Sequence, residues 1–299
     1  MADLRVDPRL AECLADNAGR PTADVNAMTP AEARAVYAQS REMWNTGDPA
    51  MAEVRRRVLQ LDDIEMPAVT FVPNDARPGA TVFLHGGGWV MGSTATHDGI
   101  MRRLADLTHR PVIGLDYQLA PESQRPVTVR ACTAAISRII GDTEGPVVIA
   151  GDSAGAELSL SATLSLRDAG ETLPDGLCLA YPALWPRFET ESHNRCGDGR
   201  FGLSTDTMRG FWEHYLGDGE ALPARPDLSG LPRCYILGAA LDPLLDDAVD
   251  LAGLLEAAGV DRELHVPGGS THGFLHYSSA APVAMDALAA MARFVRSCG

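Results

Sequence analysis

Short apolar runs rich in valine, isoleucine and phenylalanine recur from about residue 59 onward, and stretches with apolar residues at helical spacing lie between them. Ile100, Leu104 and Leu107 show this helical spacing, as do the residues of a final predicted helix at about 282–297. The alternation predicts an α/β domain with a mostly parallel central sheet flanked by helices. The runs predicted to be strands are 68–72, 80–84, 111–117, 146–150, 234–238 and 263–267.

Two segments depart from this alternation. Residues 1–55 precede the first predicted strand and contain a capping box with proline at the first helical position, at 29–32. Residues 187–225 are polar and glycine-rich and include a helix-like stretch at 205–216. We expect 1–55 to form an N-terminal helical cap segment. The catalytic domain is then 56–299, within which 187–225 forms a second cap segment.

The charge balance limits the kinds of partner and mechanism. The 299 residues have a formal net charge of −15, which disfavours nucleic acid and anionic membranes and favours a small-molecule substrate. The length suits one catalytic domain with a small appendage. All 25 basic residues are arginine. Schiff-base enzymes, Walker phosphate loops and Ser-x-x-Lys sites all require a lysine, so these mechanisms are excluded.

Six cysteines are scattered without a C-x-x-C pair, which indicates neither a zinc site nor a redox motif. No stretch approaches about eighteen uninterrupted apolar residues, and the first ten residues include acidic groups in place of an apolar signal segment. We therefore expect a cytoplasmic protein without a membrane partner or a metal. We expect it to be a monomer or a homodimer.

A predicted strand at 146–150 runs directly into the motif GDSAG at 151–155, and an amphipathic stretch follows. A strand-to-helix turn this tight strains the backbone of the central serine and leaves room only for glycine two residues to either side. The motif in this context predicts Ser153 as a nucleophile. A simple glycine-flanked turn is the alternative. We assign the neighbouring Asp152 a local structural role.

The strand at 80–84 leads into His85 and three glycines, Gly86, Gly87 and Gly88. Backbone N–H groups can approach a developing oxyanion most closely where no Cβ obstructs them. The glycines therefore predict an oxyanion loop. Gly87 and Gly88 would act with the N–H of Ala154, the residue after the nucleophile. His85 precedes the serine in the chain, so we expect it to anchor this loop and not to act as the base.

The acid and the base of a hydrolase triad follow the serine in that order, each on a loop after a strand. Asp242 lies nearest the end of the strand at 234–238, whereas Asp246 and Asp247 fall in the next predicted helix. Three histidines follow Asp242. His265 lies within a predicted strand and His276 at the start of a helical pattern, so His272 is predicted to be the base.

Six linked motifs follow one another along the chain: HGGGW (85–89), THDGIMRRLA (96–105), DYQLAPE (116–122), GDSAGA (151–156), LDPLLDD (241–247) and HGFLHY (272–277). In these motifs the chain resembles the bacterial hormone-sensitive-lipase-like esterases, and among them most of all the bacterial acetyl esterases. The resemblance implies the α/β-hydrolase fold with a helical cap, the triad of Ser153, Asp242 and His272, and short acyl esters, such as acetyl esters, as substrates.

Three positions depart from the family pattern. Family members commonly have arginine where Gln118 stands, and glycine followed by asparagine where Ala156 and Glu157 stand. These departures concern local packing and substrate preference, because none of them falls on a triad residue.

Four aromatic residues are candidates for narrowing the acyl pocket. Trp44, Phe211 and Trp212 lie in the expected cap segments, and Trp89 follows the oxyanion loop. The alternative for each is that it fills the hydrophobic core.

Together these residues predict acyl transfer through a serine-bound intermediate, a mechanism that requires no cofactor. A short-chain carboxylesterase is the favoured function. An amidase, such as an arylformamidase, could use the same triad but has to protonate a poorer leaving group. A non-catalytic ligand-binding protein with a hydrolase fold is a further alternative, although such proteins usually lack a triad member and none is missing here.

Overall fold

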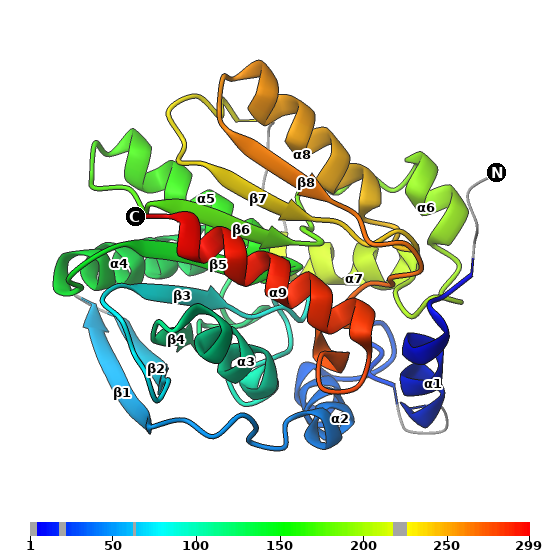
Figure 1. Ribbon diagram of the computed structural model, residues 1–299. Helices are drawn as coiled ribbons and strands as arrows, with labels where there is room; N and C mark the ends of the chain where they lie inside the picture. Colours follow the sequence, from blue (N-terminus) through cyan, green and yellow to red (C-terminus); the bar gives the residue numbers. More distant parts are fainter. Residues whose placement is uncertain (1–4, 18–21, 62–63, 218–225) are drawn as a thin grey trace.

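The computed structural model describes residues 5–17, 22–61, 64–217 and 226–299 of the chain. In these residues an eight-stranded sheet has the strand order β1-β2-β4-β3-β5-β6-β7-β8 (Figure 1). The pairs β1–β2 and β2–β4 are antiparallel, and all the others are parallel, which confirms the mostly parallel sheet. The strands are β1 (Glu53–Leu61), β2 (Ile64–Val72), β3 (Ala80–Leu84), β4 (Val112–Leu115), β5 (Val147–Asp152), β6 (Gly176–Ala180), β7 (Cys234–Leu237) and β8 (Arg262–His265).

Helices cover both faces of the sheet (Figure 1). None of the described helices combines the length and the apolar character that a membrane span needs. The α-helices are α1 (Pro8–Asn17), α2 (Pro30–Arg41), α3 (Asp98–Thr108), α4 (Arg125–Asp142), α5 (Ala154–Asp168), α6 (Glu191–Cys196), α7 (Thr205–Leu216), α8 (Leu245–Ala257) and α9 (Pro282–Ser297), with 3-10 turns η1 (Glu42–Trp44) and η2 (Phe274–Tyr277).

The alternation of side chains along each strand divides the core into two layers. In β3, Val82 and Leu84 pack in one apolar cluster with α4, α5 and α8. Phe83 points to the other face and packs with α3 and α9. Because both faces are covered, the central strands are continuously buried, and this is why they appear in the sequence as unbroken apolar runs.

Two strands were not predicted from the sequence. β1 is mostly exposed, and its middle carries three consecutive arginines at 55–57, so it lacks an apolar pattern. It forms because all nine of its residues pair with β2. β6 is a five-residue segment that pairs on both sides, with β5 and β7. The boundary expected at residue 55 falls inside β1.

The carboxyl ends of the parallel strands meet at one edge of the sheet, and the loops that follow β3, β5, β7 and β8 carry the predicted site residues. α1, α2, α6 and α7, which come from the two expected cap segments, gather at this end of the molecule (Figure 1). Residues 1–4, 18–21 and 218–225 of those segments lie outside the described residues.

Candidate active site

The turn between β5 and α5 holds Ser153 in a strained conformation. β5 ends at Asp152 and α5 begins at Ala154, which leaves a single residue for the turn. Ser153 has φ 54° and ψ −117°, a region of backbone angles that residues other than glycine rarely occupy. A Cβ on Gly155 would collide with the carbonyl of Leu84 on β3, so the close approach of α5 to the sheet requires glycine there.

The structure brings together the three residues predicted to form the triad. His272 Nε2 lies 2.9 Å from Ser153 Oγ, and His272 Nδ1 lies 2.7 Å from Asp242 Oδ2. The other carboxylate oxygen of Asp242 accepts the N–H of Leu244 at 2.9 Å. Asp242 is fully buried. Its carboxylate accepts Nδ1–H and thereby leaves Nε2 of the imidazole as the acceptor for the serine hydroxyl.

The residues that compete for these roles have other partners. Asp246 accepts the N–H of Ser192, and Asp247 forms an ion pair with Arg187 at 2.8 Å. His265 lies 2.8 Å from the hydroxyl of a tyrosine on β7. None of these groups forms a hydrogen bond with Ser153 among the described residues, in agreement with the choice of Asp242 and His272 made from chain order.

The glycine loop after β3 lies beside the serine. Gly87 (φ 125°) and Gly88 (φ 61°) adopt left-handed conformations, and both line the same cavity as Ser153. Ala154 is the first residue of α5, so its N–H has no acceptor within the helix. Gly86, the first of the three glycines that predict the oxyanion loop, is not an oxyanion donor, so its inclusion among the oxyanion-hole residues is wrong. Its N–H donates to Asp152 Oδ1 at 2.8 Å and is therefore not free for an oxyanion.

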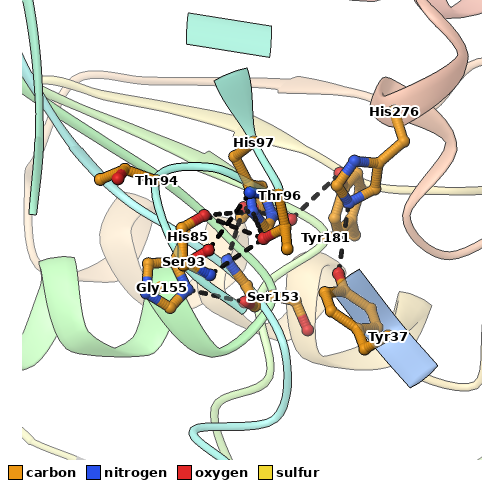
Figure 2. A network of polar contacts seen from close by, with 12 residues as sticks. Tyr37, His85, Ser93, Thr94, Thr96, His97, Ser153, Gly155, Tyr181 and His276 are labelled. Atoms are coloured by element: carbon orange, nitrogen blue, oxygen red, sulfur yellow. Dashed lines mark hydrogen bonds and ion pairs between the residues drawn. The ribbon is translucent and has the colours of Figure 1, made fainter. Parts of the chain in front are cut away.

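Asp152 is the buried acceptor that fixes this loop. Besides the N–H of Gly86, its Oδ1 lies 3.3 Å from His97 Nε2. Burial raises the pKa of Asp152, but His97 and the hydrogen bond from Gly86 outweigh burial and hold the pKa below its ordinary value. Figure 2 shows the ring of His97 between those of His85 and His276. His97 lies in the motif at 96–105, but no role was assigned to it from the sequence, because nothing in that motif indicated which buried group it would meet.

His85 anchors the loop, as expected. Its Nδ1 lies 2.9 Å from the carbonyl of Gly86, and its own carbonyl accepts the Tyr117 hydroxyl at 2.7 Å. The two rings stack with centroids 4.3 Å apart. Burial and the neighbouring His97 lower the pKa of His85 to about 4, so this imidazole is neutral at physiological pH.

One group of buried side chains within the described residues has the composition of a metal site. The potential ligand atoms of His97, Asp152 and His276 lie within 4.8 Å of one another. The contacts already present give these residues another task, since Asp152 holds Gly86 and faces His97 while His276 Nε2 lies 3.4 Å from the Tyr37 hydroxyl. We assign the group to ordering of the site.

A cavity of about 360 Å³ opens above Ser153 and His272. Its walls come from the glycine loop, from α1, α2 and α7, and from η2. Phe211 lines it, as predicted, and packs so closely on Gly88 that a Cβ on Gly88 would meet the Phe211 ring.

A larger hollow of about 610 Å³ lies along α4, but it contains none of the predicted site residues, so the smaller cavity is the candidate binding site.

The other three aromatic candidates do not line this cavity, and their assignment to the pocket is wrong. Trp44 packs edge-on against Tyr277, with ring centroids 4.9 Å apart. Trp89 stacks on Tyr215 with ring centroids 4.4 Å apart, and the ring centroid of Trp212 lies 4.4 Å from that of Trp89. All three fill the core beneath the cavity wall, the alternative considered for them.

Glu157, one of the departures from the family pattern, is a buried hub. Its carboxylate accepts Trp89 Nε1 at 3.2 Å and the Tyr215 hydroxyl at 3.0 Å, and it pairs with Arg125 at 3.1 Å. The carboxylate therefore joins α5, the helix that follows Ser153, to the end of the glycine loop and to α7. Arg125 supplies the countercharge that a buried carboxylate requires.

Comparison with known proteins gives one family match and several similar solved structures, and both agree with the fold and the site described above. Residues 81–276 match a family model described as the α/β-hydrolase fold, and the chain belongs to this family. The hyperthermophilic esterase of the archaeon Pyrobaculum calidifontis is 28% identical, with 98% of each chain covered and a TM-score of 0.90. A thermostable esterase from Pseudomonas putida is 25% identical over 100% of this chain and 99% of that chain, with a TM-score of 0.89.

An ester hydrolase from the metagenome of Lake Arreo is likewise 28% identical, with 98% of each chain covered and a TM-score of 0.87. Near-complete coverage by structures that are themselves esterases agrees with the site geometry. The protein is accordingly an enzyme, a carboxylic ester hydrolase of the α/β-hydrolase type.

The buried histidines predict acid sensitivity. Burial lowers the pKa of His276 well below its ordinary value, and the pKa of His85 is about 4 against 6.5 when unperturbed. Between these values the unfolded chain binds more protons than the folded protein, so the free energy of unfolding rises with pH in this window and falls on acidification. We expect the urea concentration at which half of the protein is unfolded to be lower at about pH 4.5 than at about pH 7. The decrease should be smaller in His85→Gln. An equal fall in both proteins would contradict this assignment.

Removal of the Glu157 carboxylate should destabilise the protein strongly. Glu157→Ala removes the ion pair with Arg125 and deprives two buried donors, Trp89 Nε1 and the Tyr215 hydroxyl, of their acceptor. Each unsatisfied donor costs about 1–3 kcal/mol in the free energy of unfolding. Glu157→Gln keeps an acceptor oxygen and should cost less. Chemical denaturation measures the free energy of unfolding of both variants. Glu256→Gln is the matched control, because Glu256 on α8 forms an exposed ion pair with Arg262, and it should change the stability by no measurable amount. Equal midpoints for Glu157→Ala and the control would refute the hub.

Proposed function

We propose that the protein is a serine carboxylesterase that hydrolyses short-chain acyl esters, acetyl to butyryl, with Ser153 as nucleophile, His272 as general base and Asp242 as its orienting acid. The observation that carries the proposal is the continuous chain of hydrogen bonds from Ser153 Oγ through both nitrogens of His272 to Asp242, at the base of the cavity. Geometry of this kind, and not position in the chain, defines the triad.

In the first step His272 Nε2 takes the proton of Ser153, whose Oγ attacks the carbonyl carbon of the ester. The N–H groups of Gly87, Gly88 and Ala154 donate to the oxyanion of the tetrahedral intermediate. The protonated imidazole then gives its proton to the leaving alcohol. Water attacks the acyl-enzyme with His272 again as base. As the bond between the acyl carbon and Ser153 Oγ breaks, the imidazolium gives this proton to Oγ and the carboxylic acid leaves. Asp242 stays ionised throughout and stabilises the imidazolium.

The dimensions of the site support a short acyl chain. The cavity, about 360 Å³, falls near the lower end of the range of small-molecule pockets. Phe211 on α7 closes in directly on Gly88 and limits the space beside the oxyanion donors. The helices that bring Phe211 and the opposite wall to the serine, α7 and α1–α2, form the cap in this proposal.

The six cysteines are unpaired and buried, which supports a cytoplasmic location because that compartment is reducing.

The triad assignment predicts an ordered loss of turnover on p-nitrophenyl acetate. By the subtilisin precedent, Ser153→Ala and His272→Ala should each lower kcat by roughly a millionfold, and Asp242→Asn by roughly ten-thousandfold. His265→Gln and Asp246→Asn, matched changes at residues bonded elsewhere, should retain activity. Initial rates with circular dichroism as a check on folding measure the series. Full activity in Ser153→Ala would overturn the mechanism.

The acyl preference is tested separately. We expect rapid hydrolysis of p-nitrophenyl acetate and butyrate and slow hydrolysis of the octanoate, because the longer chain exceeds the space beside Phe211. An acetanilide should react most slowly, since its amine is a poorer leaving group than an alcohol. Values of kcat/KM for the four compounds decide the matter. Preferential cleavage of the anilide would identify an amidase, and preferential cleavage of the octanoate would contradict the short-chain assignment.

A further inference from the structure

The walls of the active-site cavity differ in character. The wall contributed by α7 and the turn before it is mainly apolar, with Phe201, Met208 and Phe211 beside a single hydroxyl, that of Thr207. The wall contributed by α1, α2 and η2 is mainly polar, with Asn17, Arg41 and the hydroxyl-bearing residues Tyr37, Ser40 and Tyr277, beside Leu14 of α1. An ester whose acyl and alcohol parts are both plain hydrocarbon could not form hydrogen bonds with the second wall. The polar side chains there therefore indicate a substrate with a further polar group.

Arg41, the last residue of α2, is the positive charge of this wall and the one basic side chain other than histidine among the described residues that line the cavity. Its guanidinium lies over the ring of Tyr37, 4.8 Å from the centroid. Its Nε is buried and has no hydrogen-bond partner. The polar groups that face it within the described chain are the hydroxyls of Tyr37 and Tyr277, and no carboxylate is among them.

Arg41 keeps its charge in this position. Burial lowers its pKa, but the two tyrosine hydroxyls outweigh burial and the pKa stays above its ordinary value. The acid that lines the same cavity, Asp152, is held by Gly86 and His97. His276, close by, is neutral, because burial and the charge of Arg41 lower its pKa. The cavity therefore presents a guanidinium whose countercharge is not supplied by the described protein.

A half-buried cation with an unsatisfied donor is costly in the free enzyme and complementary to an anion that enters the cavity. The planar fork of a guanidinium matches a carboxylate in two parallel hydrogen bonds. We propose that Arg41 binds a carboxylate of the substrate, so that the preferred substrates are short esters that carry a second, free carboxylate. The inference rests on the proposed function for the identity of the reacting ester.

The carboxylate can belong to either part of the ester, and matched pairs of compounds separate the two cases. For the alcohol part the pair is 3-acetoxypropanoate and 3-acetoxypropanamide, and for the acyl part it is monomethyl succinate and methyl succinamate. Each pair differs by a charge at nearly constant shape. We expect the kcat/KM of the carboxylate to exceed that of the amide about tenfold or more in at least one pair, the range of a charge-assisted hydrogen bond.

Variants assign this preference to Arg41. The ratio of kcat/KM between carboxylate and amide should fall to about one in Arg41→Met and be partly retained in Arg41→Lys, which keeps the charge but loses the fork. Arg57→Met removes an equal charge from the exposed strand β1 and should leave the ratio unchanged. A ratio near one in the wild type for both pairs, or an undiminished ratio in Arg41→Met, would overturn the proposal.

Binding to an inactive enzyme separates this inference from the esterase proposal. Calorimetry on Ser153→Ala should show tighter binding of the preferred carboxylate than of its amide, by about tenfold. The Ser153→Ala/Arg41→Met double variant should lose the difference. If no ester is hydrolysed by the wild type and this binding difference is still found, the anion site stands and the esterase proposal fails. If neutral esters are hydrolysed and both ligands bind equally, the anion site fails and the esterase proposal stands.

Discussion

The carboxylate of Asp152 is the contact on which the geometry of the site depends. It ends β5 one residue before the strained Ser153, and it holds the N–H of Gly86 at the start of the oxyanion loop. Ser153 and the glycine loop follow neighbouring strands, β5 and β3, and this buried group sets the distance between them. A buried carboxylate is tolerated only where donors surround it. The N–H of Gly86 and the Tyr181 hydroxyl donate to it, and the ring of His97 lies beside it.

A second buried carboxylate joins the sheet to the cap. Glu157 on α5 holds Tyr215 of α7 and Trp89 after the oxyanion loop, with Arg125 as countercharge. Because Phe211 lies one turn before Tyr215 on the same helix, this contact also fixes the apolar wall of the cavity. The departure at Glu157 from the pattern of similar esterases is therefore compensated by an arginine on α4. The opposite wall, built from α2, carries Arg41, for which the described residues supply no carboxylate partner.

Prediction from the sequence succeeded where a local rule decides the structure. The stretches 205–216 and 282–297 became α7 and α9 with the same bounds, because their apolar residues repeat at helical spacing. β1 was missed because its exposed, arginine-rich sequence becomes a strand only by pairing with β2. The assignment of Trp44, Trp89 and Trp212 to the pocket was wrong, because composition cannot tell a core aromatic from one on a cavity wall.

The sequence by itself predicted the residues of the proposed triad. The order of motifs along the chain and the glycines around the turn after β5 single out Ser153, Asp242 and His272, since a tight strand-to-helix turn constrains residues that are close in the chain. The tertiary structure alone decided the surroundings of those residues. Arg41 lies more than a hundred residues before the serine and belongs to no motif. It reaches the cavity because α2 packs at the carboxyl edge of the sheet, a long-range contact that no local pattern encodes.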